Sequence, residues 1–141
     1  MELTSALELA GAYHNGVLVT LKRDGRPQLS NITYVVGSDG LIRVSVTDGR
    51  AKAANLRRDP RASLYVTRPD FWAYFVIEAT AELSPTAASP DDATVDELVD
   101  VYRSAQGEHP DWDEYRRVMV EDRRLVVRLR PEHAYGMWSP S

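Results

Sequence analysis

Cysteine is the first of several features that this sequence lacks. None of its 141 residues is a cysteine, which excludes disulfide bonds, thiol nucleophiles and metals bound by thiolates. No apolar run approaches the roughly 18 residues of a membrane-spanning helix. The opening residues, Met1 to Thr4, also lack the charged-then-apolar order of a signal peptide. We therefore expect a cytoplasmic protein with no membrane partner.

An excess of positive charge is also missing. The net charge is -4, whereas a protein that binds nucleic acid usually carries a basic surplus, so nucleic acid is not an expected partner. The three histidines, His14, His109 and His133, are far apart and have no carboxylate at ligand spacing, so no metal site is predicted. Glycine-rich phosphate loops and paired carboxylates are absent too, and no catalytic side chain is predicted.

The chain does have the composition of an ordinary folded domain. Apolar residues make up 43% and charged residues 27%, which argues against disorder, and we expect residues 1–141 to form one domain. The first predicted element is a helix with a capping box at Ser5–Glu8. Three strands follow over 17–21, 27–36 and 41–46, joined by two Asp-Gly turns as an antiparallel meander. The remaining elements are a short helix over 50–58, strands over 62–67 and 72–83, a helix capped by Ser89 that begins at Pro90, a helix capped by Asp111, and a strand over 125–129.

This order of elements predicts a mainly β fold with peripheral helices. The strands do not alternate regularly with helices, so a parallel doubly wound sheet is not expected. Consecutive antiparallel strands with few helices favour a small barrel or sandwich, because closure protects the edge strands.

Positive charge is concentrated between Arg50 and Arg61. This segment contains five basic side chains and one acid, Asp59, in a protein whose net charge is negative. Arg50 and Lys52 lie at the predicted start of the short helix, where free backbone amides and the helix dipole favour an anion. The pattern favours a site for an anionic, phosphate-bearing ligand, and the alternative is a solvated basic face. The nearby polar residues that could help to bind or position this ligand are Ser45, Thr47 and Asn55.

Two other strands carry unusual side chains for a buried position. In the second strand, Gln28 and Ser30 share one face and Asn31 lies on the other, so polar groups occur on both faces. The edge of a ligand would satisfy these groups, and so would solvent at an exposed edge strand. Trp72 and Tyr74 share a face of a later predicted strand and could stack on a planar ring, although packing in a core or a dimer is the simpler explanation.

Several segments of the chain together resemble the pyridoxamine 5′-phosphate oxidase-like superfamily. The resemblance rests on residues 25–31, 44–46 and 50–62, with support from 111–116 and 133–136. Within the superfamily, the chain is most similar to the actinobacterial branch of deazaflavin-dependent (coenzyme F420) oxidoreductases. The fold that this resemblance implies is a split β-barrel, an FMN-binding-like antiparallel Greek-key barrel.

The resemblance also implies a homodimer with cofactor sites at the subunit interface. The implied cofactor is F420, with FMN as the alternative. Relatives hold the cofactor phosphate with the residues that match Arg50 and Lys52. The other residues that the resemblance assigns to the cofactor are Ser45 and Asn55 as helpers at the phosphate, Gln28, Ser30 and Asn31 at the ring, and Trp72 and Tyr74 from the partner subunit.

The implied activity is hydride transfer between the deazaflavin and an unidentified small-molecule substrate. The alternatives are an FMN-dependent oxidase or reductase of the same fold, and a non-catalytic carrier of the cofactor or of haem, for which His133 is the only loosely plausible ligand. The segment 125–138 lacks the Arg-Leu-His-Asp-Arg type of motif with which true pyridoxamine phosphate oxidases grip their substrate, so that substrate is a poor candidate. Arg57, Arg58 and Arg61 are either solvated or attract the polyglutamate tail of F420.

Overall fold

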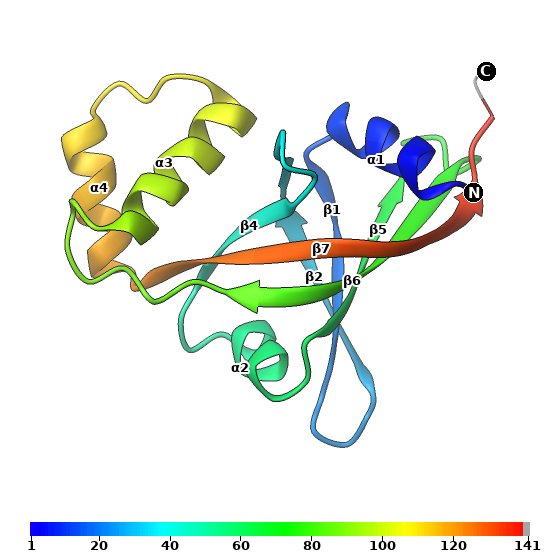
Figure 1. The fold of residues 1–141 in the computed structure, drawn as a ribbon, viewed down its shortest axis with the longest axis horizontal. Helices are drawn as coiled ribbons and strands as arrows, with labels where there is room; N and C mark the ends of the chain where they lie inside the picture. Colours follow the sequence, from blue (N-terminus) through cyan, green and yellow to red (C-terminus); the bar gives the residue numbers. More distant parts are fainter. Residues whose placement is uncertain (140–141) are drawn as a thin grey trace.

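The structure is a computed structural model, and it describes residues 1–139. Over these residues the chain forms seven strands and four helices (Figure 1). None of the described helices is long and apolar enough to cross a membrane. In chain order the elements are α1 (Leu3–Gly11), β1 (Asn15–Leu21), β2 (Pro27–Thr33), β3 (Val35–Val36), β4 (Ile42–Thr47), α2 (Ala51–Arg58), β5 (Arg61–Thr67), β6 (Tyr74–Leu83), α3 (Ala93–Gln106), α4 (Trp112–Glu121) and β7 (Arg124–Met137).

The strands form one antiparallel sheet in the order β2-β1-β5-β6-β7-β4-β3. β2 and β3 therefore lie at opposite edges of the sheet, although only Tyr34 separates them in the chain. Two residues of extended chain span about 7 Å at most, so the two edges must come together at this point. The sheet curls into a half-barrel, and the predicted class of fold, a mainly β split barrel with peripheral helices, is confirmed.

The break at Tyr34 makes the predicted three-stranded meander wrong. Tyr34 is fully buried, and its hydroxyl donates to the backbone oxygen of Ala10 in α1 at 2.9 Å. The residues before it pair with β1 and the residues after it pair with β4. The two Asp-Gly turns are nevertheless confirmed, because each closes one of these hairpins and both turn glycines, Gly25 and Gly40, have positive φ.

Two cores lie on the two faces of the sheet. The main core fills the inside of the curl and includes Ala6 and Ala10 of α1. A smaller core lies on the outer face, where α3 and α4 pack against β7. Figure 1 shows these two helices side by side at one end of the long strand β7. The smaller core contains Ala87, Val95, Leu98, Val99, Tyr115, Met119 and Val126.

The start of α1 differs from the prediction. The helix begins at Leu3, so Ser5 lies inside its first turn and the predicted capping box is wrong. Glu2 occupies the N-cap position without a side-chain hydrogen bond. Burial of Ala6 and Ala10 in the main core fixes this helix, and packing therefore outweighs the capping signal.

The start of α3 also differs from the prediction, whereas that of α4 agrees with it. α3 begins at Ala93 rather than at Pro90, because the carboxylate of Asp92 caps it by accepting from the amide of Val95 at 2.8 Å. The same carboxylate also accepts from two amides of the preceding loop, which a serine hydroxyl could not do as well. Asp111 caps α4 as predicted.

Candidate functional site

One face of the β4–β7 pair carries the charged residues from which the site is built. In the antiparallel register, Arg43 lies opposite Arg128 at one end and Thr47 lies opposite Arg124 at the other. Opposed residues share a face, and so do alternate residues along each strand. Val126 of the smaller core lies between the two ends. The same outer face therefore has arginines at both ends and an apolar contact in its middle.

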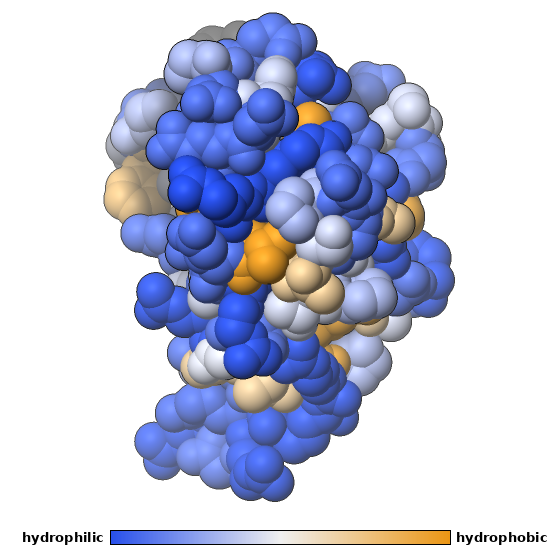
Figure 2. Space-filling model, turned by 90° about the vertical axis from the view of Figure 1, so that its left-hand side faces the viewer, coloured by the Kyte–Doolittle hydropathy of each residue, from blue (hydrophilic) through white to orange (hydrophobic). Residues whose placement is uncertain are grey.

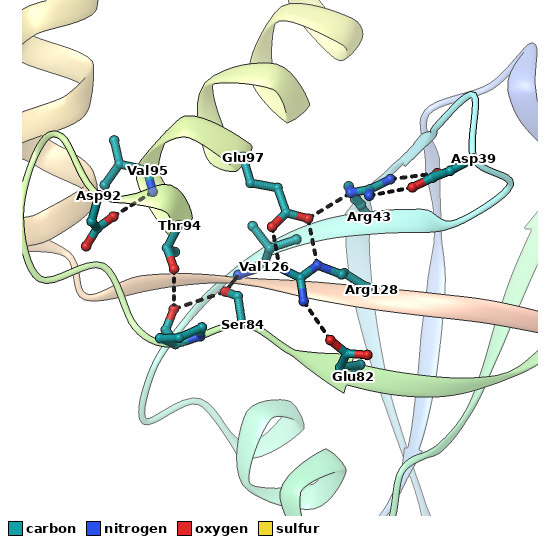
Figure 3. Close-up of polar contacts among 11 residues, drawn as sticks. Asp39, Arg43, Glu82, Ser84, Asp92, Thr94, Val95, Glu97, Val126 and Arg128 are labelled. Carbon is teal, nitrogen blue, oxygen red and sulfur yellow. Dashed lines mark hydrogen bonds and ion pairs between the residues drawn. The ribbon is translucent and has the colours of Figure 1, made fainter.

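At the first end, Glu97 of α3 binds both arginines (Figure 3). One of its oxygens accepts from Nε of Arg43 and Nε of Arg128 at 2.8 Å each, and the other accepts from Nη2 of Arg128 at 2.6 Å. Asp39 accepts from Arg43, and Glu82 accepts from Arg128. The hydrogen bonds from Arg128 and Arg43 hold the pKa of Glu97 below its usual value. We call these five residues the closed cluster, and it fastens α3 to the sheet.

At the second end of this face there is an open cavity of about 590 Å³. Three cations line it, Arg50, Lys52 and Arg124, and none of the described lining residues is an aspartate or a glutamate. We call this the cation cavity. Its other lining residues come from β2, β4, α3 and α4, and they are Asn31, Ile32, Thr33, Ser45, Val46, Thr47, Val101, Tyr102, Ala105, Gln106, Tyr115 and Met119.

Two of the three cations come from the start of α2. Arg50 occupies the N-cap position of the helix and Lys52 lies in its first turn, where the unpaired amides and the helix dipole add positive potential. Burial lowers the pKa of Lys52, and the neighbouring charges of Arg50 and Arg124 lower it further. Arg50, Lys52 and Ser45, which the sequence analysis placed together, line one cavity.

The third cation, Arg124, was missed by the sequence analysis. Its Nη1 lies 3.5 Å from Oγ of Ser45, and its Nε lies 3.9 Å from a carboxylate oxygen of Asp122. The Nε atom of Arg124 is buried and has no hydrogen-bond partner. It is the only such buried side-chain nitrogen or oxygen in residues 1–139. Arg124 precedes an ordinary apolar strand in the sequence. Only the β4–β7 register brings it opposite Thr47.

Aromatic side chains of α3 and α4 form the far wall of the cation cavity. The rings of Tyr102 and Tyr115 lie 5.1 Å apart between their centroids. The hydroxyl of Tyr115 donates to the backbone oxygen of Leu98 at 3.0 Å, and burial raises its pKa to about 12. Tyr115 therefore contributes a ring rather than a free hydroxyl. The surface on the α3–α4 side is mainly hydrophilic, with a small hydrophobic area near its centre (Figure 2).

Two of the predicted site residues, Asn55 and Gln28, contact each other outside the cation cavity. Nδ2 of the buried Asn55 donates to Oε1 of Gln28 at 2.9 Å and to Oγ1 of Thr20 at 3.1 Å. Its Oδ1 accepts from Nη2 of Arg58 at 3.0 Å. This network joins α2 to the β1–β2 hairpin, so both side chains already have structural partners.

The polar residues of β2 lie on both faces, as predicted. Ser30 is half-buried and Asn31 is exposed. Asn31 lines the cation cavity and also a second cavity of about 490 Å³, which Val17 and Tyr65 line as well. β2 is an edge strand of the sheet, so solvent satisfies part of its polarity. Of the two residues, Asn31 is the one placed at a junction between cavities.

Trp72 and Tyr74 do not share a strand, contrary to the prediction. β6 begins at Tyr74, and Trp72 lies in the preceding turn with 81% of its surface exposed. Phe71 beside it is 77% exposed and has a φ of 68°, which is strained for an aromatic residue. The ring of Tyr74 lies 5.8 Å from that of Tyr65, and Tyr65 borders the second cavity. Within one chain, these aromatic residues do not line the cation cavity.

The rest of the basic segment is bound to partners within the protein. Arg57 forms an ion pair with Asp48 at 2.8 Å, and Arg61 forms one with Asp59 at 2.8 Å. Arg58 donates to the backbone oxygen of Leu21 at 2.7 Å. The segment from Arg50 to Arg61 thus separates into a pair of cations in the cavity and three arginines outside it.

The curled antiparallel sheet and its peripheral helices place the protein in the split-barrel class. A cation-lined cavity lies on the outer face of the sheet. Residues 8–138 match the family model for pyridoxamine 5′-phosphate oxidase. The match covers nearly the whole chain, and the protein therefore belongs to that family.

Solved structures show the same fold at low sequence identity. A conserved hypothetical protein from Mycobacterium tuberculosis is 24% identical with a TM-score of 0.73, covering 97% of this chain and 84% of that one. An F420 reductase is 23% identical with a TM-score of 0.62, covering 86% and 89%. HutZ, a haem storage protein from Vibrio cholerae, is 17% identical with a TM-score of 0.70, covering 97% and 96%. These likenesses establish the fold, and the deazaflavin branch stays a prediction.

Proposed function

We propose that this protein is an F420-dependent oxidoreductase that transfers a hydride between the deazaflavin and a small-molecule substrate. The observation that carries the proposal is the cation cavity, in which Arg50, Lys52 and Arg124 face no carboxylate among the described lining residues. An anionic group on a heteroaromatic cofactor fits the cations, and the adjoining polar strand β2 fits the edge of its ring. Membership of an oxidase family and the fold shared with an F420 reductase support this choice.

Each residue of the cavity has a defined role in this proposal. Arg50 and Lys52 hold the phosphate together with the first amides of α2, and the hydroxyl of Ser45 adds a donor. Asn31, at the junction of the two cavities, is placed to hydrogen-bond the edge of the ring. When bound, the deazaflavin supplies the hydride at its C5. The hydroxyl of Tyr115 is already bound to Leu98, so solvent is the proposed source of the proton.

We propose that the active form is a homodimer with the cofactor at the interface. Phe71, Trp72 and Met137 are each at least 70% exposed, and Met137 lies opposite Tyr74 in the β6–β7 pair. Exposed apolar groups that gather in this way mark an interaction surface. Trp72 and Tyr74 would then approach the cofactor of the other subunit. The cytoplasmic location stays a prediction.

Two alternatives remain for the cofactor. FMN carries a phosphate and fits the same cations. Haem is favoured by the likeness to a haem storage protein and to a haem binding protein from Mycobacterium smegmatis, and by His133, which lines a third cavity of about 390 Å³. Glu78, Glu132 and Arg61 line that cavity too. Arg61 is already paired with Asp59, so the two carboxylates would repel the propionates of haem. We therefore rank haem below both flavin-type cofactors.

The cofactor is tested by titration of the purified protein with F420 and with FMN at matched salt, followed by quenching of tryptophan fluorescence. A Soret absorption band would indicate haem instead. Lys52→Met should weaken binding of the true cofactor about 10- to 100-fold, because a charge-assisted hydrogen bond contributes about 1.5–3 kcal/mol. Lys22→Met, in the exposed β1–β2 turn, is the matched control. Equal affinity of the Lys52 variant and the wild type would contradict the proposed site.

Turnover separates an enzyme from a carrier. We expect the protein to oxidise reduced F420 when small unsaturated or heteroaromatic acceptors are added. Saturating cofactor binding without turnover on any acceptor would indicate a carrier.

A further inference from the structure

We propose that Arg124 binds a second negative charge of the cofactor, beyond the charge held by Arg50 and Lys52, and thereby makes the cavity specific for doubly anionic ligands. The inference rests on the proposed function, since it concerns the anionic end of the same cofactor. It assigns a ligand-binding role to a strand residue outside the basic segment.

The guanidinium of Arg124 lies at the cation cavity and has only weak contacts within the protein. Its guanidinium reaches the cation cavity from the first residue of β7, opposite Thr47. Two contacts from its nitrogens are at the limit of hydrogen bonding or beyond it, at 3.5 Å to Ser45 and 3.9 Å to Asp122. Its buried Nε has no hydrogen-bond partner among the described residues and only the long ion pair with Asp122. A buried guanidinium nitrogen without a partner is costly to the fold unless a ligand satisfies it.

The number of charges points to a ligand with more than one negative charge. Three cations line the cavity, and the acidic partner of Arg124, Asp122, is 3.9 Å away, so a singly charged anion would leave positive charge in the cavity. Burial is the main cause of the lowered pKa of Lys52, and the neighbouring charges of Arg50 and Arg124 lower it further. Binding of a second negative charge would relieve this repulsion, and a neutral ligand would not.

The second charge has two possible chemical sources. A phosphate monoester, as in FMN, gains its second charge at a pKa of about 6. In F420 the phosphate is followed by glutamyl carboxylates, which are ionised above about pH 4.3. The two sources share the chemistry that Arg124 recognises, and they differ in how binding depends on pH.

The test compares Arg124→Gln with Arg123→Gln. Arg123 is the neighbouring arginine, and its side chain is 70% exposed and paired with Asp48 at 2.7 Å. Each variant is titrated with F420 and FMN, and with riboflavin as the analogue of FMN without a phosphate. We expect Arg124→Gln to lower the affinity for whichever cofactor the wild type binds by about tenfold or more. The affinity for riboflavin should not change. Arg123→Gln should bind every ligand as the wild type does.

The outcomes separate this inference from the proposed function. If FMN rather than F420 binds, and binds more weakly to Arg124→Gln, the F420 function fails and the inference stands. If F420 binds the wild type and Arg124→Gln equally well, the function stands and the inference is overturned. If neither F420 nor FMN binds, the inference is tested by thermal unfolding of the wild type and of Arg124→Gln in sodium pyrophosphate. Stabilisation of the wild type but not of Arg124→Gln supports the inference, and equal or absent stabilisation overturns it.

The pH dependence identifies the source of the second charge. For a phosphate monoester, the ratio of wild-type to Arg124→Gln affinity should rise between about pH 5 and pH 7.5, as the second proton of the phosphate is lost. For glutamyl carboxylates the ratio should be constant over this range. A ratio of one at every pH, with either cofactor, overturns the inference.

Discussion

The two ends of the β4–β7 pair have the same basic residue type and opposite surroundings. At the closed cluster, Arg43 and Arg128 share the carboxylate of Glu97, and each has a further acidic partner. At the cation cavity, Arg124 has a buried nitrogen without a partner and stands with two more cations. The arginines of one end are satisfied within the protein, whereas those of the other end are available to a ligand.

If the proposed site binds the cofactor, a single strand pair serves both stability and binding. The closed cluster fixes α3, and the same helix supplies Tyr102 and Gln106 to the wall of the cation cavity. The energetic cost of the weakly partnered Arg124 is therefore confined to the cation cavity. The closed cluster holds the α3 wall of that cavity in place. Changes that exchange the character of the two ends test this interpretation.

The largest effect should come from adding a carboxylate to the cation cavity. Ser45→Asp places an acid beside Nη1 of Arg124, which is now 3.5 Å from the serine hydroxyl. We expect affinity for the anionic cofactor to fall at least about 100-fold, because like charges in contact cost several kcal/mol. The melting temperature of the free protein should hold or rise, since Arg124 gains a partner. Fluorescence titration and thermal unfolding measure the two effects.

Ser38→Asp is the control for this change. It adds the same charge in the exposed turn between β3 and β4, near the closed cluster. Cofactor affinity should stay within about twofold of the wild type. A comparable loss of affinity in both variants would mean that overall charge, rather than the cavity, controls binding.

The next largest effect should come from opening the closed cluster. Glu97→Gln should lower the free energy of unfolding by about 2–3 kcal/mol, because Arg43 and Arg128 lose their shared charged acceptor. The pKa of Glu97 is lowered in the folded state, so its contribution is complete above its unfolded pKa of about 4.3 and is lost as the pH falls through the folded value. The difference from wild type in denaturant unfolding should therefore shrink in acid. Glu121→Gln, on the exposed side of α4, should show neither effect.

A smaller effect is expected from pH at the cation cavity. The charge on Lys52 favours an anion, and its pKa in the free protein is below the ordinary 10.5. A bound anion raises that pKa, so affinity should be complete below the free-state pKa and decline as the pH rises above it. Lys52→Arg should abolish the decline, because arginine stays charged. Titrations from pH 7 to pH 10.5 would contradict this account if both proteins lost affinity in parallel.

The smallest effect is expected at the arginines outside both regions. Arg57 is paired with Asp48, and its side chain is 48% exposed. Arg57→Gln should change the free energy of unfolding by less than about 1 kcal/mol and leave cofactor affinity within about twofold. A large loss of affinity for F420 but not for FMN would instead assign Arg57 to the polyglutamate tail.

Local signals in the sequence predicted most of the strands and the grouping of Arg50 and Lys52 at the start of α2. The Asp-Gly turns, the alternating strand predicted over 41–46 and the cap at Asp111 depend on neighbours in the chain. The structure has all three, with the strand at Ile42–Thr47. The break at Tyr34 is different, because it depends on which edge of the sheet each side of the residue joins. No local pattern contains that information.

The same limit applies to the site. Arg50 and Lys52 were predicted because a helix start is a local feature. Arg124 was not, because its place beside Ser45 depends on pairing between residues 79 apart in the sequence. Asn55 was singled out as a polar residue in a basic helix, and the structure gives it a half-buried partner in Gln28. Spacing alone does not distinguish an amide that binds a ligand from one that joins two elements.

The central position of β7 has a consequence for folding. The hairpins β1–β2 and β3–β4 form between neighbours in sequence, but β7 alone connects β6 to β4. Such distant pairing is slow, because the closure of a long loop precedes any gain from contacts. β7 supplies Arg128 to the closed cluster and Arg124 to the cation cavity, so neither region exists until this strand has docked. An anion that binds the cavity would therefore stabilise the state in which β7 has docked and the half-barrel is complete.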